Sequence, residues 1–208
     1  MVCRWAKVSG EKRIILLIVK HVWRPMQQIY ETDRLILKTL DGTSAADAAD
    51  YFARNRDFLR IWEPSKSGEF YTAARQRELL AEEQKSMDEE RSLRLWIFKK
   101  DEPCRIIGAL GFHNIVYGAF CSCHMGYKLD EGEINKGYAT EAAKKGIEIM
   151  FSRYGLHRIE ANIMPKNARS LRVAQKLGFY NEGLARQYLK INGKWEDHYH
   201  MVLLNERV

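Results

Sequence analysis

Residues 129–142 read Leu-Asp-Glu-Gly-Glu-Ile-Asn-Lys-Gly-Tyr-Ala-Thr-Glu-Ala, a polar turn between a predicted strand and a predicted helix. Alternating residues predict the strand over Phe120–Leu129, and apolar residues at helical spacing predict the helix over Tyr138–Tyr154. The first N–H groups of such a helix have no partner inside it, and the positive end of its dipole lies at the same point. Gly137 lets an anion come close to the backbone, and the small Ala139 leaves that approach open. The turn therefore predicts a phosphate-binding site.

The turn matches neither of two common phosphate-binding motifs. A Walker loop would need Gly-Lys followed by Ser or Thr, and a dinucleotide-binding turn would need G-x-G-x-x-G. Since many strand–turn–helix joints contain a glycine, the turn by itself is also compatible with a purely structural role. The rest of the chain has to decide between these two interpretations.

The remaining elements follow in an order typical of a mixed α/β (α+β) sheet in one domain. Strands are predicted at Leu35–Thr39, Leu93–Phe98, Arg105–Phe112, Arg158–Ile163, Gly183–Ile191 and Trp195–Leu204. Helices are predicted at Ala45–Arg56, Thr72–Arg91 and Ala168–Leu177. The connections between the strands are too varied for a doubly wound parallel fold.

The composition is that of an ordinary globular chain. Of 208 residues, 46% are hydrophobic and 29% are charged, which excludes a disordered tail, a fibre or a repeat array. The longest apolar run, Ile14–Val19, is far shorter than the roughly 20 residues of a membrane span. Cys3, Cys104, Cys121 and Cys123 are too few for a disulfide scaffold and lack the C-x-x-C spacing of a structural metal site. We therefore expect a cytoplasmic protein with reduced cysteines and no metal.

The positive charge is concentrated at the N-terminal end. Residues 1–25 carry six basic residues and one acidic residue, a net charge of +5, out of +7 for the whole chain. The remaining +2 makes direct nucleic-acid binding unexpected, because such binding depends on neutralising phosphates. The leader has three interpretations: a signal peptide, an arm that binds nucleic acid or membrane, or sequence before the true start codon. Lys20 and His21 break its apolar run and no small-residue cleavage site follows, which disfavours secretion. We interpret 1–25 as a dispensable or non-native basic leader and 26–208 as a single domain.

Six groups of residues form a recognisable set. They are Glu31-Thr32-Asp33-Arg34-Leu35-Ile36-Leu37; Asn55 with Trp62-Glu63-Pro64; Ile107-Gly108 with Gly111-Phe112; Gly126-Tyr127-Lys128-Leu129 with Lys136-Gly137-Tyr138-Ala139-Thr140-Glu141-Ala142; Asn167-x-x-Ser170 with Leu177-Gly178-Phe179; and Asn192-Gly193-Lys194-Trp195-x-Asp197-His198. Together they resemble the GNAT N-acetyltransferases, in particular the RimJ and RimL type that acetylates the N-termini of ribosomal proteins. The resemblance extends from Tyr30 to about Leu204.

The resemblance implies a mixed, mostly antiparallel seven-stranded sheet flanked by about four helices. Two parallel strands, Phe120–Leu129 and Arg158–Ile163, are expected to splay into a V-shaped opening, in which the amides of acetyl-CoA complete the interrupted sheet. Its pyrophosphate is expected on the helix start. The residues that the resemblance implies for acetyl-CoA binding are Tyr127, Leu129, Asn135, Lys136, Gly137, Tyr138, Ala139, Thr140 and Asn167.

Two positions depart from the family pattern. Ile134 stands where Gln or Arg is usual, which should weaken phosphate contact without abolishing it, because backbone N–H groups do most of the binding. Many members use a tyrosine as proton donor to the departing thiolate, and Ala174 occupies that position here. Ser170 matches the serine of the RimL type and is the expected donor, while Asn167 is expected to contact the pantetheine arm. Both residues also suit the N-cap and first turn of the following helix.

The general base has three candidates, Glu63, Glu160 and His113. At pH 7 about one α-amine in ten is already neutral, compared with fewer than about one lysine in a thousand. A carboxylate or an imidazole acting through water would therefore suffice for an α-amine. For each candidate a structural or solvated role is the favoured alternative to catalysis. His198 and His200 share a strand face and are expected to pack or to face the substrate.

The resemblance implies transfer of an acetyl group from acetyl-CoA to a primary amine, with the N-terminal α-amine of a ribosomal protein as the leading acceptor. Two alternatives stay open: a small-molecule amine N-acetyltransferase, and a non-catalytic GNAT-fold protein that binds RNA or the ribosome. The expected partners are acetyl-CoA and a protein N-terminus, without a membrane. The expected assembly is a monomer or a homodimer.

We expect deletion of residues 1–25 to leave folding and activity unchanged, because the first recognisable element begins after Met26. Thermal unfolding midpoints and acetyl-transfer rates of the full and shortened chains would be compared. Loss of either property in the shortened chain would show that the leader belongs to the functional protein.

Overall fold

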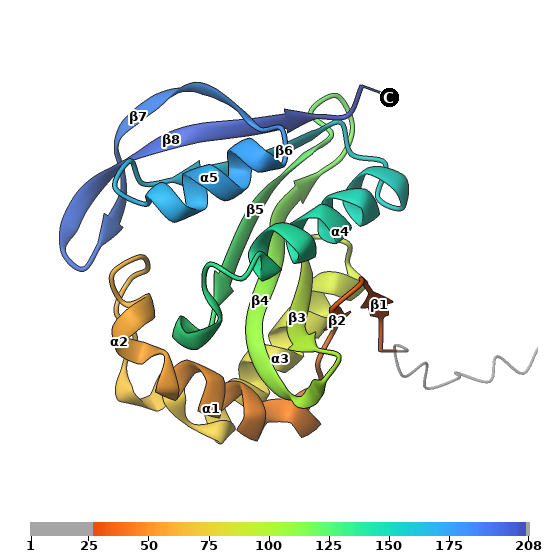
Figure 1. Cartoon of the computed structure of the whole chain (residues 1–208), viewed down its shortest axis with the longest axis vertical. Helices are drawn as coiled ribbons and strands as arrows, with labels where there is room; N and C mark the ends of the chain where they lie inside the picture. The colour runs from red at the N-terminus through yellow and green to blue at the C-terminus, as the bar shows by residue number, and fades with distance from the viewer. Residues whose placement is uncertain (1–26, 207–208) are drawn as a thin grey trace, which may run out of the picture.

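The computed structural model describes residues 27–206, in which helices cover both faces of one sheet (Figure 1). The expectation for the leader, residues 1–25, lies outside the described residues. Within this range eight strands lie in the order β1-β2-β3-β4-β5-β6-β8-β7. Their bounds are β1 Ile29–Glu31, β2 Leu35–Lys38, β3 Leu93–Lys99, β4 Glu102–Val116, β5 Ser122–Leu129, β6 Arg158–Ile163, β7 Tyr180–Ile191 and β8 Lys194–Leu204. The α-helices are α1 Ala45–Arg54, α2 Arg56–Leu59, α3 Ala73–Asp88, α4 Tyr138–Ser152 and α5 Ala168–Lys176.

The mixed, mostly antiparallel sheet that we expected is confirmed, with one strand more than expected. The additional strand, β1, pairs antiparallel with β2. The turn between them is closed by Thr32, whose backbone N–H donates to the Leu35 carbonyl at 3.0 Å and whose hydroxyl accepts from the Leu35 N–H at 3.0 Å. A strand of three residues is too short to give a periodic pattern in the sequence.

The first predicted helix, Ala45–Arg56, corresponds to α1, and a short helix α2 follows it after Asn55, which makes five helices where about four were expected. The Asn55 side chain is buried. The amide Nδ2 donates to the Tyr51 carbonyl at 2.8 Å, and Oδ1 accepts from the Glu131 N–H at 2.9 Å. Asparagine competes with the backbone for hydrogen bonds and so favours the end of a helix. The second bond ties α1 to the turn that precedes α4.

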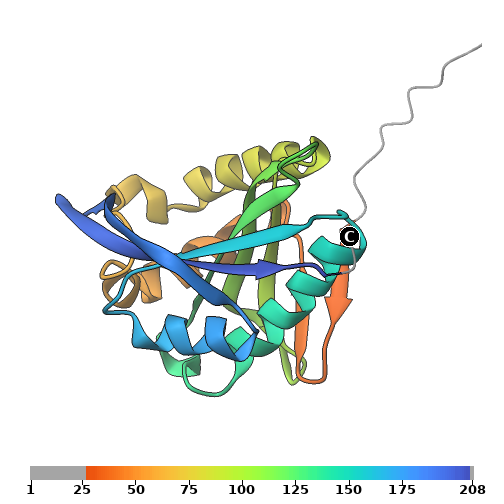
Figure 2. The same ribbon diagram turned by 90° about the horizontal axis from the view of Figure 1, so that it is seen from above.

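The alternation of side chains along the strands creates two apolar layers. Leu95 and Ile97 of β3 belong to the layer that packs under α4, whereas Trp96 and Phe98 belong to the layer under α1 and α3. Figure 2 shows α3 on one face of the sheet and α4 and α5 on the other. The start of α4 is therefore held in place by burial of the rest of that helix.

The strands β5 and β6 form a parallel pair that stays together over three residues and then separates. The paired residues are Ser122 with Arg158, Cys123 with Ile159, and His124 with Glu160. Beyond them β5 continues beside β4 to Leu129, and β6 continues beside β8 to Ile163. The V-shaped opening expected between these two strands is confirmed. Each of them has a backbone edge that faces the opening and not another strand.

We expect Gly146→Ala to destabilise the protein although alanine favours helices. A Cβ at Gly146, in the middle of α4, would lie 2.5 Å from Leu110 Cδ2 and 2.8 Å from Phe112 Cε2. Overpacking of this kind costs about 1–3 kcal/mol, which exceeds the gain in helix propensity of about 1 kcal/mol. The measurement is the free energy of unfolding in urea. Gly68→Ala, where a Cβ meets nothing within 4 Å, is the control, and equal stabilities of the two variants would contradict the close contact between α4 and the sheet.

Candidate functional site

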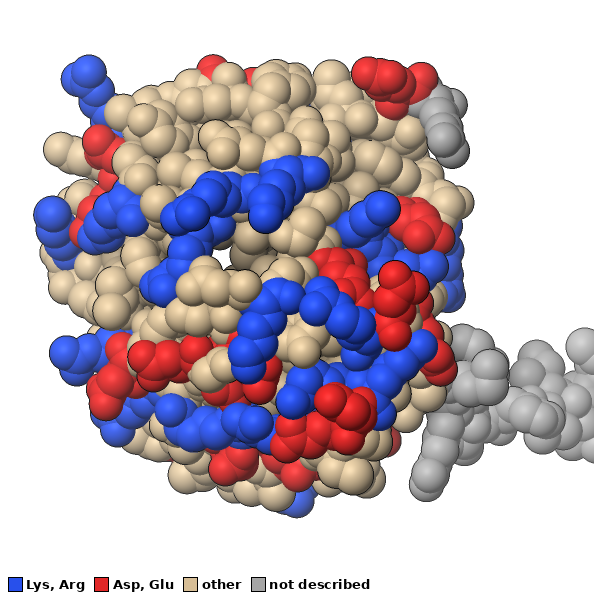
Figure 3. Space-filling view, in the orientation of Figure 1, with Lys and Arg blue, Asp and Glu red and all other residues tan. Residues whose placement is uncertain are grey.

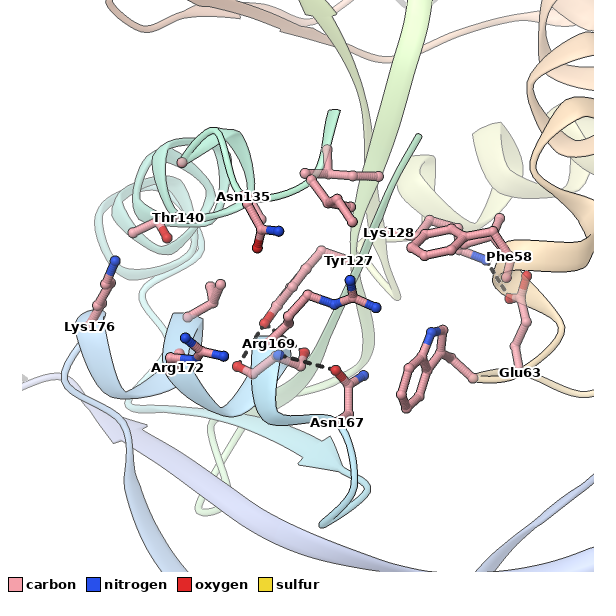
Figure 4. Close-up of a pocket in the computed structure, with 18 residues that line it drawn as sticks. Phe58, Glu63, Tyr127, Lys128, Asn135, Thr140, Asn167, Arg169, Arg172 and Lys176 are labelled. Carbon is pink, nitrogen blue, oxygen red and sulfur yellow. Dashed lines mark hydrogen bonds and ion pairs between the residues drawn. The ribbon is translucent and has the colours of Figure 1, made fainter. Parts of the chain in front are cut away.

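A cleft of about 560 Å³ lies at the opening between β5 and β6 (Figure 4). It is lined by the end of β5, the turn into α4, one side of α5, and the segment from α2 to Glu63. The lining residues are Phe58, Leu59, Trp62, Glu63, Tyr127, Lys128, Leu129, Ile134, Asn135, Gly137, Ala139, Thr140, Asn167, Arg169, Ser170, Arg172, Val173 and Lys176. In the space-filling view of Figure 3 an opening bordered by basic side chains lies near the centre of the molecule.

The start of α4 forms one end of the cleft. Gly137 is the N-cap residue, with a φ of 87° in the left-handed region. Because glycine has no side chain that could cap the helix, the first N–H groups stay open to the cleft. Glu141, in the first turn, accepts from the Thr32 hydroxyl at 2.6 Å and from the Arg34 N–H at 2.9 Å. Burial by itself would raise the pKa of Glu141, but these hydrogen bonds outweigh it and lower that pKa. The ionised Glu141 thus fixes α4 against the β1–β2 turn.

Seven of the nine residues expected to bind acetyl-CoA line the cleft, and two lie outside its lining. Those in the lining are Tyr127, Leu129, Asn135, Gly137, Ala139, Thr140 and Asn167. Lys136 instead donates from Nζ to Glu133 Oε2 at 2.9 Å. The ring of Tyr138 lies under the Arg34 guanidinium, 4.6 Å from its centroid. Ile134 lines the cleft and also packs against the core under α4.

Ser170 and Tyr127 form a hydroxyl pair in the middle of the cleft. Their side-chain oxygens are 2.7 Å apart, and the Tyr127 hydroxyl also donates to the Ser170 carbonyl at 3.1 Å. Burial raises the pKa of Tyr127 to about 12, although the bond to Ser170 acts in the opposite direction. The phenol is therefore protonated at neutral pH. Ala174, where many family members have a tyrosine, is completely buried in the core.

Asn167 has the N-cap role that the sequence allowed, and its expected contact with the pantetheine arm stays a prediction. It is the N-cap of α5, and its Oδ1 accepts from the Ser170 N–H at 3.1 Å. It also lines the cleft. The same hydrogen bond that starts the helix thus orients Ser170.

Three basic residues of α5 line the cleft but were not predicted as site residues from the sequence. Arg169, Arg172 and Lys176 all line the cleft, and Figure 4 shows Arg172 and Lys176 on the side of the cleft where Thr140 lies. Their spacing of three and four residues, which places side chains on one helix face, was a signal that could have found them. Together with the start of α4, Arg172 and Lys176 make this end of the cleft suitable for anions. Arg169 lies over the Phe58 ring, toward the other end.

The opposite end of the cleft is formed by Trp62 and Glu63, near the tip of the β7–β8 hairpin. Asn192 at that tip donates from Nδ2 to the Arg60 carbonyl, and its Oδ1 accepts from the Ser65 N–H at 2.8 Å. The hairpin is thus bonded to the segment that follows α2. This contact explains why Asn192 and the Trp62-Glu63-Pro64 segment belong to one set of markers although they are far apart in the sequence.

Glu63 lines the cleft but is paired with a lysine. Its Oε2 accepts from Lys128 Nζ, and the Lys128 side chain lies over the Phe52 ring at 5.4 Å. Burial lowers the pKa of Lys128, and the charge of Glu63 opposes that shift. Lys128 was not among the predicted site residues.

The other two candidates for the base lie outside the cleft lining. Glu160, on β6, accepts from Arg158 at 2.9 Å and lies 2.9 Å from His200 Nδ1. Burial, aided by the charges of Arg94 and Lys128, lowers the pKa of His113 to about 4. An imidazole with so low a pKa accepts protons poorly at neutral pH.

Among residues 27–206, no group of three or more His, Cys, Asp or Glu side chains is arranged to hold a metal ion. In the same part of the chain, no helix is both long and apolar enough to span a membrane.

Comparison with known sequences identifies relatives over most of the chain. The family model for the acetyltransferase (GNAT) domain matches residues 34–180. The probable N-acetyltransferase YjcK of Bacillus subtilis is 35% identical over 82% of this chain and 94% of its own length. The [ribosomal protein uS5]-alanine N-acetyltransferase of Escherichia coli is 36% identical over 80% of this chain and 86% of its own length.

Comparison with solved structures gives the same result. The ribosomal-protein-S5-alanine acetyltransferase of Vibrio fischeri has a TM-score of 0.82 and 34% identity, over 86% of this chain and 97% of that one. Mycobacterium smegmatis RimJ, solved in complex with CoA-disulfide, has a TM-score of 0.77 and 27% identity, over 84% of this chain and 83% of that one. The split sheet, the open start of α4 and these matches have one explanation: the chain belongs to the GNAT family of acetyltransferases.

Proposed function

We propose that this protein transfers the acetyl group of acetyl-CoA to the α-amino group of a protein N-terminus, with an N-terminal alanine of a ribosomal protein as the acceptor. The observation that carries the proposal is the continuity of the cleft. It joins an anion-binding end at α4 and α5 to a second end at Trp62 and Glu63, with the Tyr127–Ser170 pair between them. The choice of acceptor draws on the two relatives named as S5-alanine acetyltransferases.

The residues of the cleft fit acetyl-CoA. The first N–H groups of α4, with Arg172 and Lys176 of α5, offer donors and positive charge to a pyrophosphate. Beyond His124 the edge of β5 that faces the opening has no paired strand among the described residues, so its N–H and carbonyl groups can bond the amides of a pantetheine arm. When bound, acetyl-CoA supplies the activated acetyl group.

Ser170 donates its hydroxyl hydrogen to the sulfur, and Tyr127, which donates to Ser170, holds it in position. A thiol ordinarily has a pKa of about 8.5, and one pKa unit corresponds to about 1.4 kcal/mol. Complete proton transfer from Tyr127, with its pKa raised to about 12, would therefore be uphill by roughly 5 kcal/mol. The pair stabilises the developing negative charge by hydrogen bonding, as preorganised donors do in other acyl transfers.

The electrostatics of the cleft favour an α-amine over a lysine. Glu63 is engaged with Lys128, and the pKa of His113 is held at about 4. Because neither Glu63 nor His113 is a strong base, the site suits an acceptor of which about one molecule in ten is already neutral at pH 7, as is true of an α-amine. A ribosomal acceptor would place the enzyme in the cytoplasm.

The test is acetylation of a short peptide with a free N-terminal alanine, followed by mass spectrometry. We expect one acetyl group on the α-amine and none on the same peptide when its N-terminus is blocked and a lysine side chain is the remaining amine. Modification of small amines in preference to the peptide would favour a small-molecule acetyltransferase. Binding of acetyl-CoA without any transfer would favour the non-catalytic alternative.

Ser170→Ala is expected to lower kcat of this reaction by roughly 100-fold, the usual effect of removing one preorganised donor, with little change in KM for acetyl-CoA. Tyr127→Phe should have a similar effect, and the double variant should lose less than the product of the two, since the hydroxyls share one hydrogen bond. Ser152→Ala, at the far end of α4, is the matched control. Unchanged kcat in both single variants would remove the hydroxyl pair from the mechanism.

Gly137→Ala is expected to weaken CoA binding by at least about 10-fold, measured by calorimetry. An alanine at this positive φ is strained by about 1–2 kcal/mol, and its Cβ would add bulk to the cleft lining beside the first N–H groups of α4. The Arg34 Nη2 atom, 3.2 Å from that Cβ, would also have to give by a few tenths of an ångström. Gly155→Ala is the control, because Gly155 also has a positive φ but a Cβ there meets nothing within 4 Å. Both variants should lose stability, and equal affinities for CoA would exclude the start of α4 as the anion site.

A further inference from the structure

A second group of polar residues lies on the face of the sheet opposite α4 and α5. Along β6, Ile159, Ala161 and Ile163 belong to the core under α4. Glu160 and Asn162 therefore point to the other face, because side chains alternate along a strand. His200 of β8 is the register partner of Asn162 and shares that face. None of these three residues lines the cleft described above.

Glu160 orients the imidazole ring of His200. Glu160 Oε1 lies 2.9 Å from His200 Nδ1, and Glu160 Oε2 accepts from Arg158 at 2.9 Å. The Nδ1 atom next to a carboxylate carries the proton, so in the neutral ring Nε2 has a free lone pair. His200 Nε2 is buried and has no hydrogen-bond partner among residues 27–206. A carboxylate that fixes an imidazole with its second nitrogen free is the arrangement that activates a base in many enzymes.

Asn162 presents a second unpaired acceptor beside His200. Its Nδ2 donates to the Tyr188 hydroxyl at 3.2 Å, while its Oδ1 is buried and lacks a partner in the described part of the chain. The Tyr188 ring packs edge-on against the His200 ring, with centroids 4.9 Å apart. Buried acceptors without donors cost free energy. A ligand with several N–H donors on one atom, which is a primary amine, would satisfy both.

The position of this pair connects it with the cleft. Pairing between β5 and β6 ends at His124 and Glu160, and Asn162 is the next residue of β6 on the same face. The pair therefore lies at the apex of the V, across the sheet from α5 with its Ser170. An amine bound there meets the opening from the face that α4 and α5 leave free.

We infer that Asn162 and His200 bind the acceptor amine and that His200 Nε2 takes its proton, an inference that rests on the proposed function. An N–H bond of the ammonium group breaks, an Nε2–H bond forms, and the amine keeps the lone pair that it needs as nucleophile. The imidazolium is stabilised by Glu160, which is a positioning residue. The His200 side chain as a whole is 27% exposed, although its Nε2 is buried.

Several charged or titratable groups surround His200 and belong to its environment. They are Glu160 and Arg158 on β6, Tyr188 and Glu182 on β7, His124 on β5, whose Nε2 is 3.7 Å from Glu160 Oε1, and His198 on β8 itself.

The kinetic test is the pH dependence of peptide acetylation by His200→Gln. At pH 7 we expect a loss of about 10-fold in kcat/KM, because the variant can use only the roughly one α-amine in ten that is already neutral. The rate should recover with rising pH and come within about 3-fold of the parent at pH 9, where most α-amines are neutral. The kcat/KM of Glu160→Gln should lie between the values of the parent and of His200→Gln at each pH. His157 is an exposed histidine, and kcat/KM of His157→Gln should equal that of the parent. A His200→Gln profile that parallels the parent at all pH values would overturn the inference.

The second test measures binding without catalysis. In the presence of CoA, calorimetry would compare a peptide with a free N-terminal alanine with the same peptide N-acetylated. We expect the parent to prefer the free amine at least 10-fold, Asn162→Leu to lose that preference, and Asn162→Asp, which keeps an acceptor oxygen, to retain it. Equal preference in the parent and in Asn162→Leu would refute the amine site even if His200→Gln does not fold. If the parent acetylates no peptide, the proposed function fails, whereas these outcomes test the amine site separately.

Discussion

The separation of β5 from β6 after three paired residues is the constraint on which the rest of this structure depends. A strand edge inside a sheet is ordinarily closed by a neighbour, because unpaired backbone groups attract any available strand. In this protein, contacts made by the elements around the opening hold the free edge of β5 in place and keep it accessible. The Tyr127–Ser170 contact joins β5 to α5, and the Asn55–Glu131 contact joins α1 to the turn before α4. The opening is thus a stable part of the native fold.

Charge is distributed along the cleft in a way that matches two different ligand ends. At the α5 end, Arg172 and Lys176 add to the dipole of α4. At the other end, Lys128 is neutralised by Glu63 within hydrogen-bond distance. The positive charge is therefore greater at the end where phosphates are expected, although Arg169 lies over the Phe58 ring at 5.7 Å, toward the other end. A uniformly positive cleft would attract anions along its whole length.

Much of the fold could be predicted from the sequence because most of its strands and helices follow from patterns among neighbouring residues. Alternation and helical spacing located the strands from Leu93 onward and α4, and the turn at 129–142 located the cleft. The elements that were not predicted depend on contacts between segments that are far apart in the sequence. The strand β1 exists because it pairs with β2, and the break between α1 and α2 exists because Asn55 reaches Glu131.

The site was predictable as a region and less so residue by residue. A helix start turns by about 100° per residue, so consecutive residues cannot all face one cleft, and Lys136 and Tyr138 point elsewhere. The direction of Glu160 could have been read from the apolar residues on either side of it, which face the core. The unpaired atoms of Asn162 and His200 could not have been predicted from the sequence, because the pairing of β6 with β8 brings these two residues together.

The arrangement of the two groups on opposite faces of one sheet has a kinetic consequence. In the proposed arrangement the coenzyme approaches from the side of α4 and α5, while the acceptor reaches the apex of the V from the other side. Neither ligand covers the entrance of the other. Binding then needs no compulsory order of addition, and transfer takes place in a ternary complex without an acylated enzyme. The two products can likewise depart independently, each through the side by which its precursor entered.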